Sequence, residues 1–328
     1  REVVVEYDED QWVPPTAHAL PGTPARRLRP VVAHAPTVKA YESAARLQDD
    51  ARALTRSIMD DVRLGRVINV KEIRSTVSAA VKNVIDSPDA VMWLSRIRHR
   101  DAYTSEHCVN VGLLAINFAR HLGHGEEDLN TIGIAAMLHD VGKTLTPLEV
   151  LNKEGALTQE EFELMKAHTT EGRNILMAHR NLSHGPVDVA YGHHEALDGT
   201  GYPRKLKASG IPEMTRIVTL CDVYDAVTSD RCYRKGQPSL RGLDVLQRGR
   251  GSKYDERLVD EYVRCIGLYP TGSVVELVNG AHGIVSAPTT ATVICRACCW
   301  CATSSTSPAP SACSTCRSFP GRGAWKAG

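Results

Sequence analysis

Residues 38–266 carry apolar side chains at intervals of three to four residues, and no alternating strand pattern interrupts them. This period places the apolar side chains on one face of a helix. Helices are predicted over residues 38–64, after Asn69, from Pro88, and over 101–122, 126–139, 157–179, 186–195, 212–229 and 255–266. Thr158 and Glu161 have the spacing of a capping box at the start of the helix at 157–179. The chain is therefore predicted to be mainly α, a helical bundle.

The segment before this helical region has a different composition. A strand-like run, Val3–Val5, opens the sequence, and residues 13–37 hold six of the 17 prolines. Proline-rich stretches of this kind are typical of extended linkers. We expect residues 1–37 to contain the remnant of a small, truncated N-terminal module followed by a linker.

The segment after the helical region is also unusual, because residues 277–328 contain no Asp or Glu and six of the ten cysteines. Cys295-x2-Cys298 and Cys313-x2-Cys316 have the spacing of a four-thiolate zinc site. However, residues 303–311 offer little apolar content to pack a zinc module. A shift of reading frame after Gly280 explains this composition better, and it would leave an irregular, disordered tail.

The overall charge excludes some partners. Lys and Arg number 39 against 38 for Asp and Glu, so the formal net charge is +1. A balanced chain lacks the basic surface that binds a nucleic acid polymer. No apolar run approaches the roughly 18 residues that span a bilayer. We expect a soluble, cytoplasmic protein with no membrane contact.

Histidine and aspartate residues recur along the helical region in groups that are 25–32 residues apart. One helix and its return connection take about this length, so each group can return to one end of a bundle. An isolated histidine is more often an ordinary core or surface residue, but the joint pattern indicates a metal site. The residues in this pattern are His107, His139, Asp140, His168, His193, His194 and Asp222.

The residue types suggest the chemistry. Imidazoles and carboxylates suit Fe, Mn, Co, Ni or Zn without a thiolate. Seven ligands exceed what one ion needs if positions stay open for water and substrate, whereas two ions bridged by a carboxylate account for them. The adjacent pair His139 and Asp140 suits this arrangement, with Asp140 as the bridge. A hydroxide that bridges two such ions can attack phosphorus, which predicts phosphoester hydrolysis.

Several motifs make the pattern specific. H-D-V-G-K at 139–143 resembles the HD superfamily of metal-dependent phosphohydrolases. H-H-E at 193–195 and D-G-T-G-Y-P at 198–203 resemble the HD-GYP group within it. The resemblance covers about residues 87–270. It implies a helical bundle of the HD-domain type and a phosphodiesterase that converts cyclic di-GMP to linear pGpG and onward to GMP.

The resemblance also implies roles for individual residues. The seven histidines and aspartates would bind two divalent ions, Fe or Mn, and Asp140 and Lys143 would be catalytic. Tyr103 stands where some members carry a Glu that admits a third ion, which favours two. Segment 239–250 is rich in Gly and Arg where the family has an amphipathic helix, so its packing is an open point. The implied substrate contacts are Lys143, Gly201, Tyr202, Pro203, Arg231 and Arg234.

The resulting organisation has four parts: residues 1–37 as above, connecting helices at 38–86, the catalytic domain at 87–270, and a short strand element with the cysteine-rich tail at 271–328. Two other functions stay open. The chain could be a signalling module that binds cyclic di-GMP or a GGDEF-domain partner with little turnover, or it could hydrolyse another cyclic nucleotide. A homodimer is also compatible with the sequence.

Overall fold

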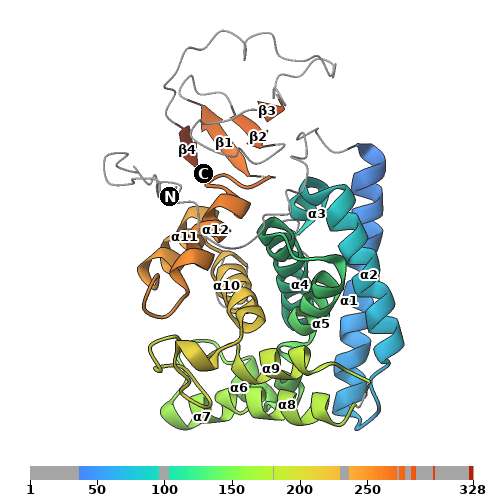
Figure 1. Cartoon of the computed structure of the whole chain (residues 1–328), viewed down its shortest axis with the longest axis vertical. Coiled ribbons are helices and arrows are strands. Elements are labelled where there is room, and N and C mark those ends of the chain that lie inside the picture. The colour runs from blue at the N-terminus through green and yellow to red at the C-terminus, as the bar shows by residue number, and fades with distance from the viewer. Residues whose placement is uncertain are drawn as a thin grey trace.

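The computed structural model describes residues 37–95, 103–179, 181–229, 236–271, 273–277, 282–285, 298–299 and 325–327. In these residues the chain is mainly helical, as Figure 1 shows, which confirms the predicted bundle. The α-helices are α1 (Val38–Arg63), α2 (Val70–Asp86), α3 (Pro88–Leu94), α4 (Tyr103–Leu122), α5 (Glu126–Leu138), α6 (Leu148–Leu151), α7 (Gln159–Lys166), α8 (His168–Met177), α9 (His184–Gly192), α10 (Glu213–Thr228), α11 (Ser239–Arg248) and α12 (Glu256–Ile266). Short 3-10 helices are η2 (Val141–Leu145) and η3 (Ala208–Gly210).

One predicted helix is wrong in its extent, because residues 157–179 form two helices that meet at Ala167. The capping box at the start of α7 is present, with bonds in both directions between Thr158 and Glu161. At the junction, the side chains of His168 and Thr169 hydrogen-bond to carbonyl groups three residues earlier, at 2.6 and 3.0 Å. Such side-chain bonds compete with the backbone ladder, which interrupts the helix.

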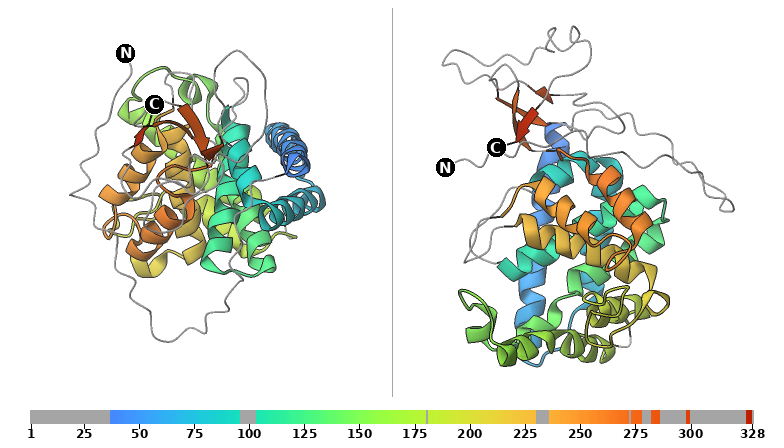
Figure 2. Two further views of the ribbon diagram at one scale, coloured as in Figure 1. Left: turned by 90° about the horizontal axis from the view of Figure 1, so that it is seen from above. Right: turned by 90° about the vertical axis from the view of Figure 1, so that its left-hand side faces the viewer.

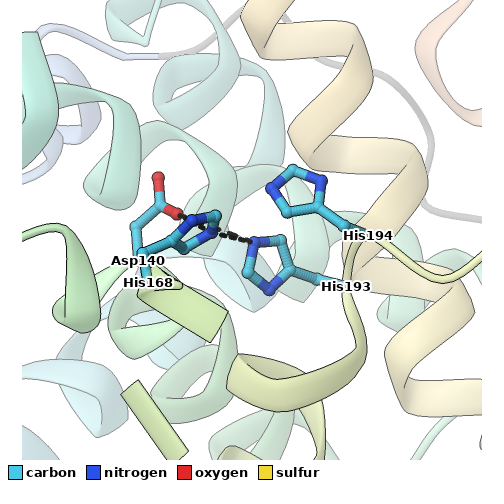
Figure 3. Close-up of side chains that lie close together, drawn as sticks. All are labelled: Asp140, His168, His193 and His194. Carbon is cyan, nitrogen blue, oxygen red and sulfur yellow. Dashed lines mark hydrogen bonds and ion pairs between the residues drawn. The ribbon is translucent and has the colours of Figure 1, made fainter. Parts of the chain in front are cut away.

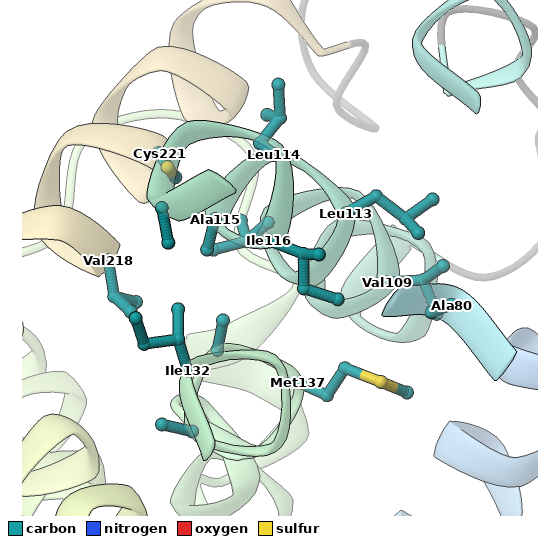
Figure 4. Close-up of a cluster of buried hydrophobic side chains, with 14 of the residues drawn as sticks. Ala80, Val109, Leu113, Leu114, Ala115, Ile116, Ile132, Met137, Val218 and Cys221 are labelled. Atoms are coloured by element: carbon teal, nitrogen blue, oxygen red, sulfur yellow. The ribbon is translucent and has the colours of Figure 1, made fainter. Parts of the chain in front are cut away.

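A single apolar core joins the helices. Figure 4 shows its centre, where Val109, Leu113 and Ile116 of α4 lie near Ile132 and Met137 of α5. Leucine, isoleucine, valine and alanine fill most of this core, as the low phenylalanine content leads one to expect. Because α4 and α5 are anchored in it, the residues at their ends are held in fixed positions.

Helices α1 and α2 lie side by side along one side of the bundle, as Figure 1 and the left view of Figure 2 show. They pack against α4 and α5 and contribute to the same core. Arg52 of α1 is buried and forms an ion pair with Glu106 of α4 at 3.2 Å. The segment 38–86 is thus packed against α4 and α5, the second of which leads into the H-D motif at 139–140, rather than standing apart from them.

Segment 239–250, whose packing the sequence left open, forms the amphipathic helix α11. Its glycine explains how the helix packs, because a Cβ at Gly242 would come within 2.8 Å of the Tyr224 ring and 2.9 Å of the Thr228 methyl group. The small residue therefore lets α11 approach α10 closely. Leu243 and Leu246 of the same helix are buried.

Four short strands form an antiparallel sheet beyond the helices, in the order β3-β2-β1-β4. They are β1 (Val274–Leu277), β2 (His282–Val285), β3 (Cys298–Cys299) and β4 (Trp325–Ala327). The sequence predicts a strand at β1 but not the three short strands β2, β3 and β4 after Gly280. Residues 1–36, and with them the predicted module and linker, lie outside the described residues, as do most residues of the proposed zinc spacing. No described helix is long and apolar enough to cross a membrane.

Candidate metal centre

The seven histidines and aspartates predicted as metal ligands come together where five helices meet. Six of them are buried, and the seventh, His194, is partly exposed. Their positions are fixed by the bundle: His107 in α4, His139 and Asp140 directly after α5, His168 at the start of α8, His193 and His194 directly after α9, and Asp222 in α10. Residues from five parts of the chain therefore share one site.

Asp140 occupies the centre of this site. Its Oδ1 lies 3.5 Å from His168 Nε2 and 3.6 Å from His193 Nε2. Its Oδ2 lies 3.3 Å from His139 Nε2 and 3.7 Å from His107 Nε2. Figure 3 shows Asp140 facing His168 and His193. The two oxygens of one carboxylate thus face two different pairs of imidazoles.

The remaining two residues divide between these pairs. Asp222 Oδ1 lies 3.0 Å from His107 Nε2 and 3.8 Å from His139 Nε2. The ring of His194 lies 4.1 Å from that of His193, centroid to centroid. Two groups of donors thus include Asp140, one with His107 and His139 and one with His168, His193 and His194, and a third group joins His139, His193 and Asp222. This arrangement is compatible with more than one bound ion.

The imidazole rings are held so that Nε2 points inward. The Nδ1 atoms of His139, His168 and His193 hydrogen-bond to the backbone carbonyls of Ala136, Met165 and Val189, at 2.6, 2.6 and 3.0 Å. A carbonyl only accepts, so each Nδ1 carries the proton and Nε2 keeps its lone pair. That is the tautomer that a metal ion needs.

His107 is oriented differently, by a side chain that the sequence did not single out. Its Nδ1 lies 2.7 Å from Asp225 Oδ2, and Ser229 Oγ donates to the other oxygen of Asp225 at 2.9 Å. Asp225 is buried and follows Asp222 by three residues on α10, so both face the same side of that helix. This spacing within D-V-Y-D is the signal that could have identified it.

Burial and nearby carboxylates shift the pKa values of the histidines in opposite directions. Burial lowers the pKa of His168 to about 3 and also lowers that of His194 well below its ordinary value. Burial would lower the pKa of His107 too, but hydrogen bonds with Asp222 and Asp225 outweigh it and raise that pKa to about 9. Two imidazoles are thus ready to bind an ion at neutral pH, while His107 must first lose a proton.

The polar atoms at the centre are suited to bound ions. His139 Nε2 and Asp140 Oδ1 are buried and have no hydrogen-bond partner among the described residues. His168 Nε2 and His193 Nε2 lie 3.3 Å apart, although each Nδ1 already carries the proton of its ring. Unpaired buried acceptors are costly, and divalent cations between them would remove that cost. The donor set therefore fits the two ions that the sequence predicts.

Lys143, predicted to be catalytic, lies at the edge of this centre. Its Nζ is 2.5 Å from Asp140 Oδ2. Burial alone would raise the pKa of Asp140, but electrostatic interactions with His139 and Lys143 outweigh it and hold that pKa well below its usual value. Asp140 is therefore ionised, and an ammonium group stands beside it.

The loop that contains Gly201, Tyr202 and Pro203 lies next to the same centre. The Tyr202 ring stacks on the His194 ring, with centroids 4.7 Å apart and planes 28° apart. Gly201 allows the loop to pass close to the backbone at Ala196, because a Cβ at this position would come within 2.3 Å of the Ala196 backbone nitrogen. The predicted loop residues thus lie beside the predicted metal ligands.

Glu195, the third residue of the H-H-E motif, holds this loop in place. Its carboxylate is buried and accepts hydrogen bonds from the backbone N–H groups of Arg204, at 2.7 Å, and Leu206, at 2.9 Å. Sequence reasoning assigned it no role. Its partners are backbone groups nine and eleven residues away, which leave no pattern of side chains to detect.

The two arginines predicted to bind phosphate, Arg231 and Arg234, lie outside the described residues. The nearby segment 239–250 is described, and its arginines form ion pairs. Arg248 pairs with Asp244 at 3.0 Å, and Arg250 pairs with Asp260 at 2.7 Å. These pairs neutralise part of the positive charge that the sequence suggested for this region.

Comparison with known proteins identifies the class. The HD domain family matches residues 89–258, so the chain belongs to this family. A solved structure described as an HDG"Y"P protein from Bdellovibrio bacteriovorus shares the fold, with a TM-score of 0.57 at 20% identity, over 68% of this chain and 71% of that one.

The curated relatives support the resemblance to the HD-GYP group that is seen in the motifs. A cyclic di-GMP phosphodiesterase of Pseudomonas aeruginosa is 37% identical over 242 residues, covering 74% of this chain and 58% of that protein. A 3'3'-cGAMP-specific phosphodiesterase of Vibrio cholerae is 31% identical over 211 residues, covering 64% and 46%. The chain spans about half the length of the curated relatives it matches.

Proposed function

We propose that this chain is a metal-dependent phosphodiesterase that hydrolyses cyclic di-GMP to linear pGpG and then to GMP. The main support is the position of Asp140, whose two oxygens face two separate pairs of imidazoles. Two divalent ions bound there would supply positive charge for phosphate oxygens and activate water for attack on phosphorus. Iron and manganese suit this mixture of imidazole and carboxylate donors.

The chain's own residues would complete the site. We assign metal binding to His107, His139, Asp140, His168, His193, His194 and Asp222. Lys143 places an ammonium group beside Asp140, where it can contact the scissile phosphate or assist the leaving group. Tyr202 offers a ring face next to the centre for a guanine base. Arg231 and Arg234 are proposed as further phosphate contacts from the sequence alone.

The test is turnover by the protein loaded with Fe(II) or Mn(II). Cyclic di-GMP should be converted to pGpG and GMP, and chromatography would follow both products. Replacing His139 and Asp140 with Ala should abolish turnover while the helical circular dichroism is retained. His121→Ala is the matched control, because this histidine lies on α4 outside the metal centre and pairs with Glu261. Binding of cyclic di-GMP without turnover under either metal would refute the enzyme and favour the signalling module.

A second substrate is supported by the relative named as specific for 3'3'-cGAMP. Metal ions bind phosphate oxygens and do not distinguish the bases, so the donor set is compatible with either cyclic dinucleotide. Measuring kcat/KM for both substrates on the same preparation decides between them. A larger value for 3'3'-cGAMP would reassign the substrate and leave the reaction unchanged.

A further inference from the structure

A row of aromatic rings leads from the candidate metal centre to the surface. The Tyr202 ring, which stacks on His194, meets the Phe162 ring edge to face, with centroids 6.2 Å apart and planes 78° apart. Phe162 belongs to α7 and is 41% exposed. The row therefore starts at a predicted metal ligand and ends at a ring that is open to solvent.

A lysine accompanies the outer part of this row. Lys166 follows Phe162 by four residues on α7, so the two lie on the same face of the helix. Its Nζ lies 5.1 Å from the centroid of the Phe162 ring and 5.8 Å from that of Tyr202. The same ammonium pairs with Glu163 Oε1 at 2.7 Å, an exposed carboxylate. We call Phe162, Lys166 and Tyr202 the α7 lip.

Helix α7 contributes little to the hydrophobic core. None of its eight residues, all of them described, is buried. A helix that packed only for stability would bury an apolar face. Instead, α7 leaves an aromatic ring and a cation beside the loop that adjoins the metal ligands. These are the two groups that a nucleotide requires, since its base stacks on a ring and its phosphate pairs with a cation.

We propose that Phe162 and Lys166 form the subsite for the half of a cyclic dinucleotide that is not being cleaved. This inference rests on the proposed function. A cyclic dinucleotide has two bases and two phosphates, and only one phosphate can be attacked at the metal centre at a time. Phe162 stacks on the distal base, and Lys166 binds the distal phosphate, giving up part of its contact with Glu163. Tyr202 lies between this subsite and the metal centre.

The α7 lip predicts a difference between large and small substrates. Bis(p-nitrophenyl) phosphate has one phosphodiester, no nucleobase and no second phosphate, so it can reach the metal centre without this subsite. Loss of one base–aromatic stack weakens binding by roughly 5- to 100-fold. We expect Phe162→Ala to raise the Kd and KM for cyclic di-GMP by about that factor. The KM for the small substrate should stay within about twofold of its wild-type value, because this substrate has no base to stack.

The experiment uses the full chain loaded with Mn(II) and titrates cyclic di-GMP calorimetrically, alongside kinetics with both substrates. Phe162→Trp should restore binding, and Lys166→Arg should bind better than Lys166→Gln. Leu164→Ala is the matched control, since Leu164 is an exposed apolar residue on the same helix. It should leave both substrates unaffected.

The outcomes separate this proposal from the proposed function. Equal losses with both substrates, or no change in the Kd of cyclic di-GMP, would overturn the subsite, because α7 would then only support the loop or have no role. If the chain binds cyclic di-GMP through Phe162 but does not hydrolyse it, the subsite stands and the enzyme proposal fails. If the wild-type chain does not bind cyclic di-GMP, the subsite is refuted.

Discussion

Removing the carboxylate of Asp225 should weaken metal binding at the group formed by His107, His139 and Asp222. Asp225 is buried and accepts the Nδ1 proton of His107 at 2.7 Å. Partners of this kind orient a metal-binding imidazole and raise its basicity, and losing one typically costs about 10- to 100-fold in metal affinity. If the site binds two ions as proposed, only one of them would depend on His107, so Asp225→Ala should leave the affinity of the other ion unchanged.

Proton competition makes this loss depend on pH. Asp225 also helps to raise the pKa of His107 to about 9, so at neutral pH the wild-type chain must release a proton from His107 to bind the ion. Wild-type affinity should therefore rise with pH, by up to about tenfold per unit, until pH approaches about 9. The variant loses one of the two carboxylates that raise the pKa of His107, so this competition is weaker in it. Its deficit should be small near neutral pH and grow as pH rises.

Calorimetric titration of metal-free protein with Mn(II), between roughly pH 6.5 and 8.5, measures both effects. Repeating it in buffers of different ionisation enthalpy counts the protons released, which Asp225→Ala should reduce. Asp225→Asn retains an acceptor for His107 and should lose less affinity. Glu261→Ala is the control. It breaks a similar carboxylate–histidine pair away from the centre, in which Glu261 of α12 lies 3.0 Å from His121 of α4. A deficit below threefold at every pH would refute the assigned role of Asp225.

Three further changes test other parts of the structure. Glu195→Gln places an amide N–H₂ against a backbone donor, so amides of residues 198–206 should exchange hydrogen faster and the KM for cyclic di-GMP should rise several-fold. Gly242→Ala brings a Cβ within 2.8 Å of Tyr224 and should lower the free energy of unfolding in urea by about 1–3 kcal/mol. Arg52→Met removes the ion pair between Arg52 and Glu106, whose side chains are 7% and 13% exposed, and should lower that free energy by about 3 kcal/mol.

Much of the fold follows from local sequence patterns. The helices from α1 to α5 begin and end within a few residues of their predicted bounds, because apolar period and capping residues act over one or two turns. The packing of α11 was harder to predict. Its Gly242 is unfavourable for an isolated helix and becomes favourable only against Tyr224 and Thr228 of α10. That neighbour cannot be read from α11 itself.

The candidate site also contains residues that the sequence predicts and residues that it does not. The spacing of histidines and aspartates predicted which residues meet, since each helix and its return connection restore the chain to one place. It could not predict Glu195, whose partners are backbone N–H groups of a loop. The α7 lip was also missed, because Phe162 and Lys166 fit an ordinary amphipathic helix until the loop with Tyr202 is placed beside them.

The ends of the helices explain why His107 alone needs a carboxylate to orient it. His139, His168 and His193 each stand just after a helix ends, at α5, α7 and α9, and each bonds to a carbonyl in that helix's last turn. A carbonyl oxygen has two lone pairs, so a nearby imidazole can bind one and fix its own tautomer, even at Val189, whose oxygen also accepts from the backbone N–H of His193 at 2.9 Å. The break at Ala167 thus serves the site, because a continuous helix at 157–179 would have used the Met165 carbonyl in its backbone ladder.

His107 lies within α4, where carbonyl groups are already bonded along the helix. Its Nδ1 must therefore find an acceptor on another element, and Asp225 of α10 supplies one. A charged acceptor has a consequence that a carbonyl does not, because it raises the pKa of the ring it orients. The position of a histidine relative to a helix end thus decides both its orientation and its proton affinity. In this site it makes His107 the one imidazole among those with a shifted pKa that metal binding must deprotonate at neutral pH.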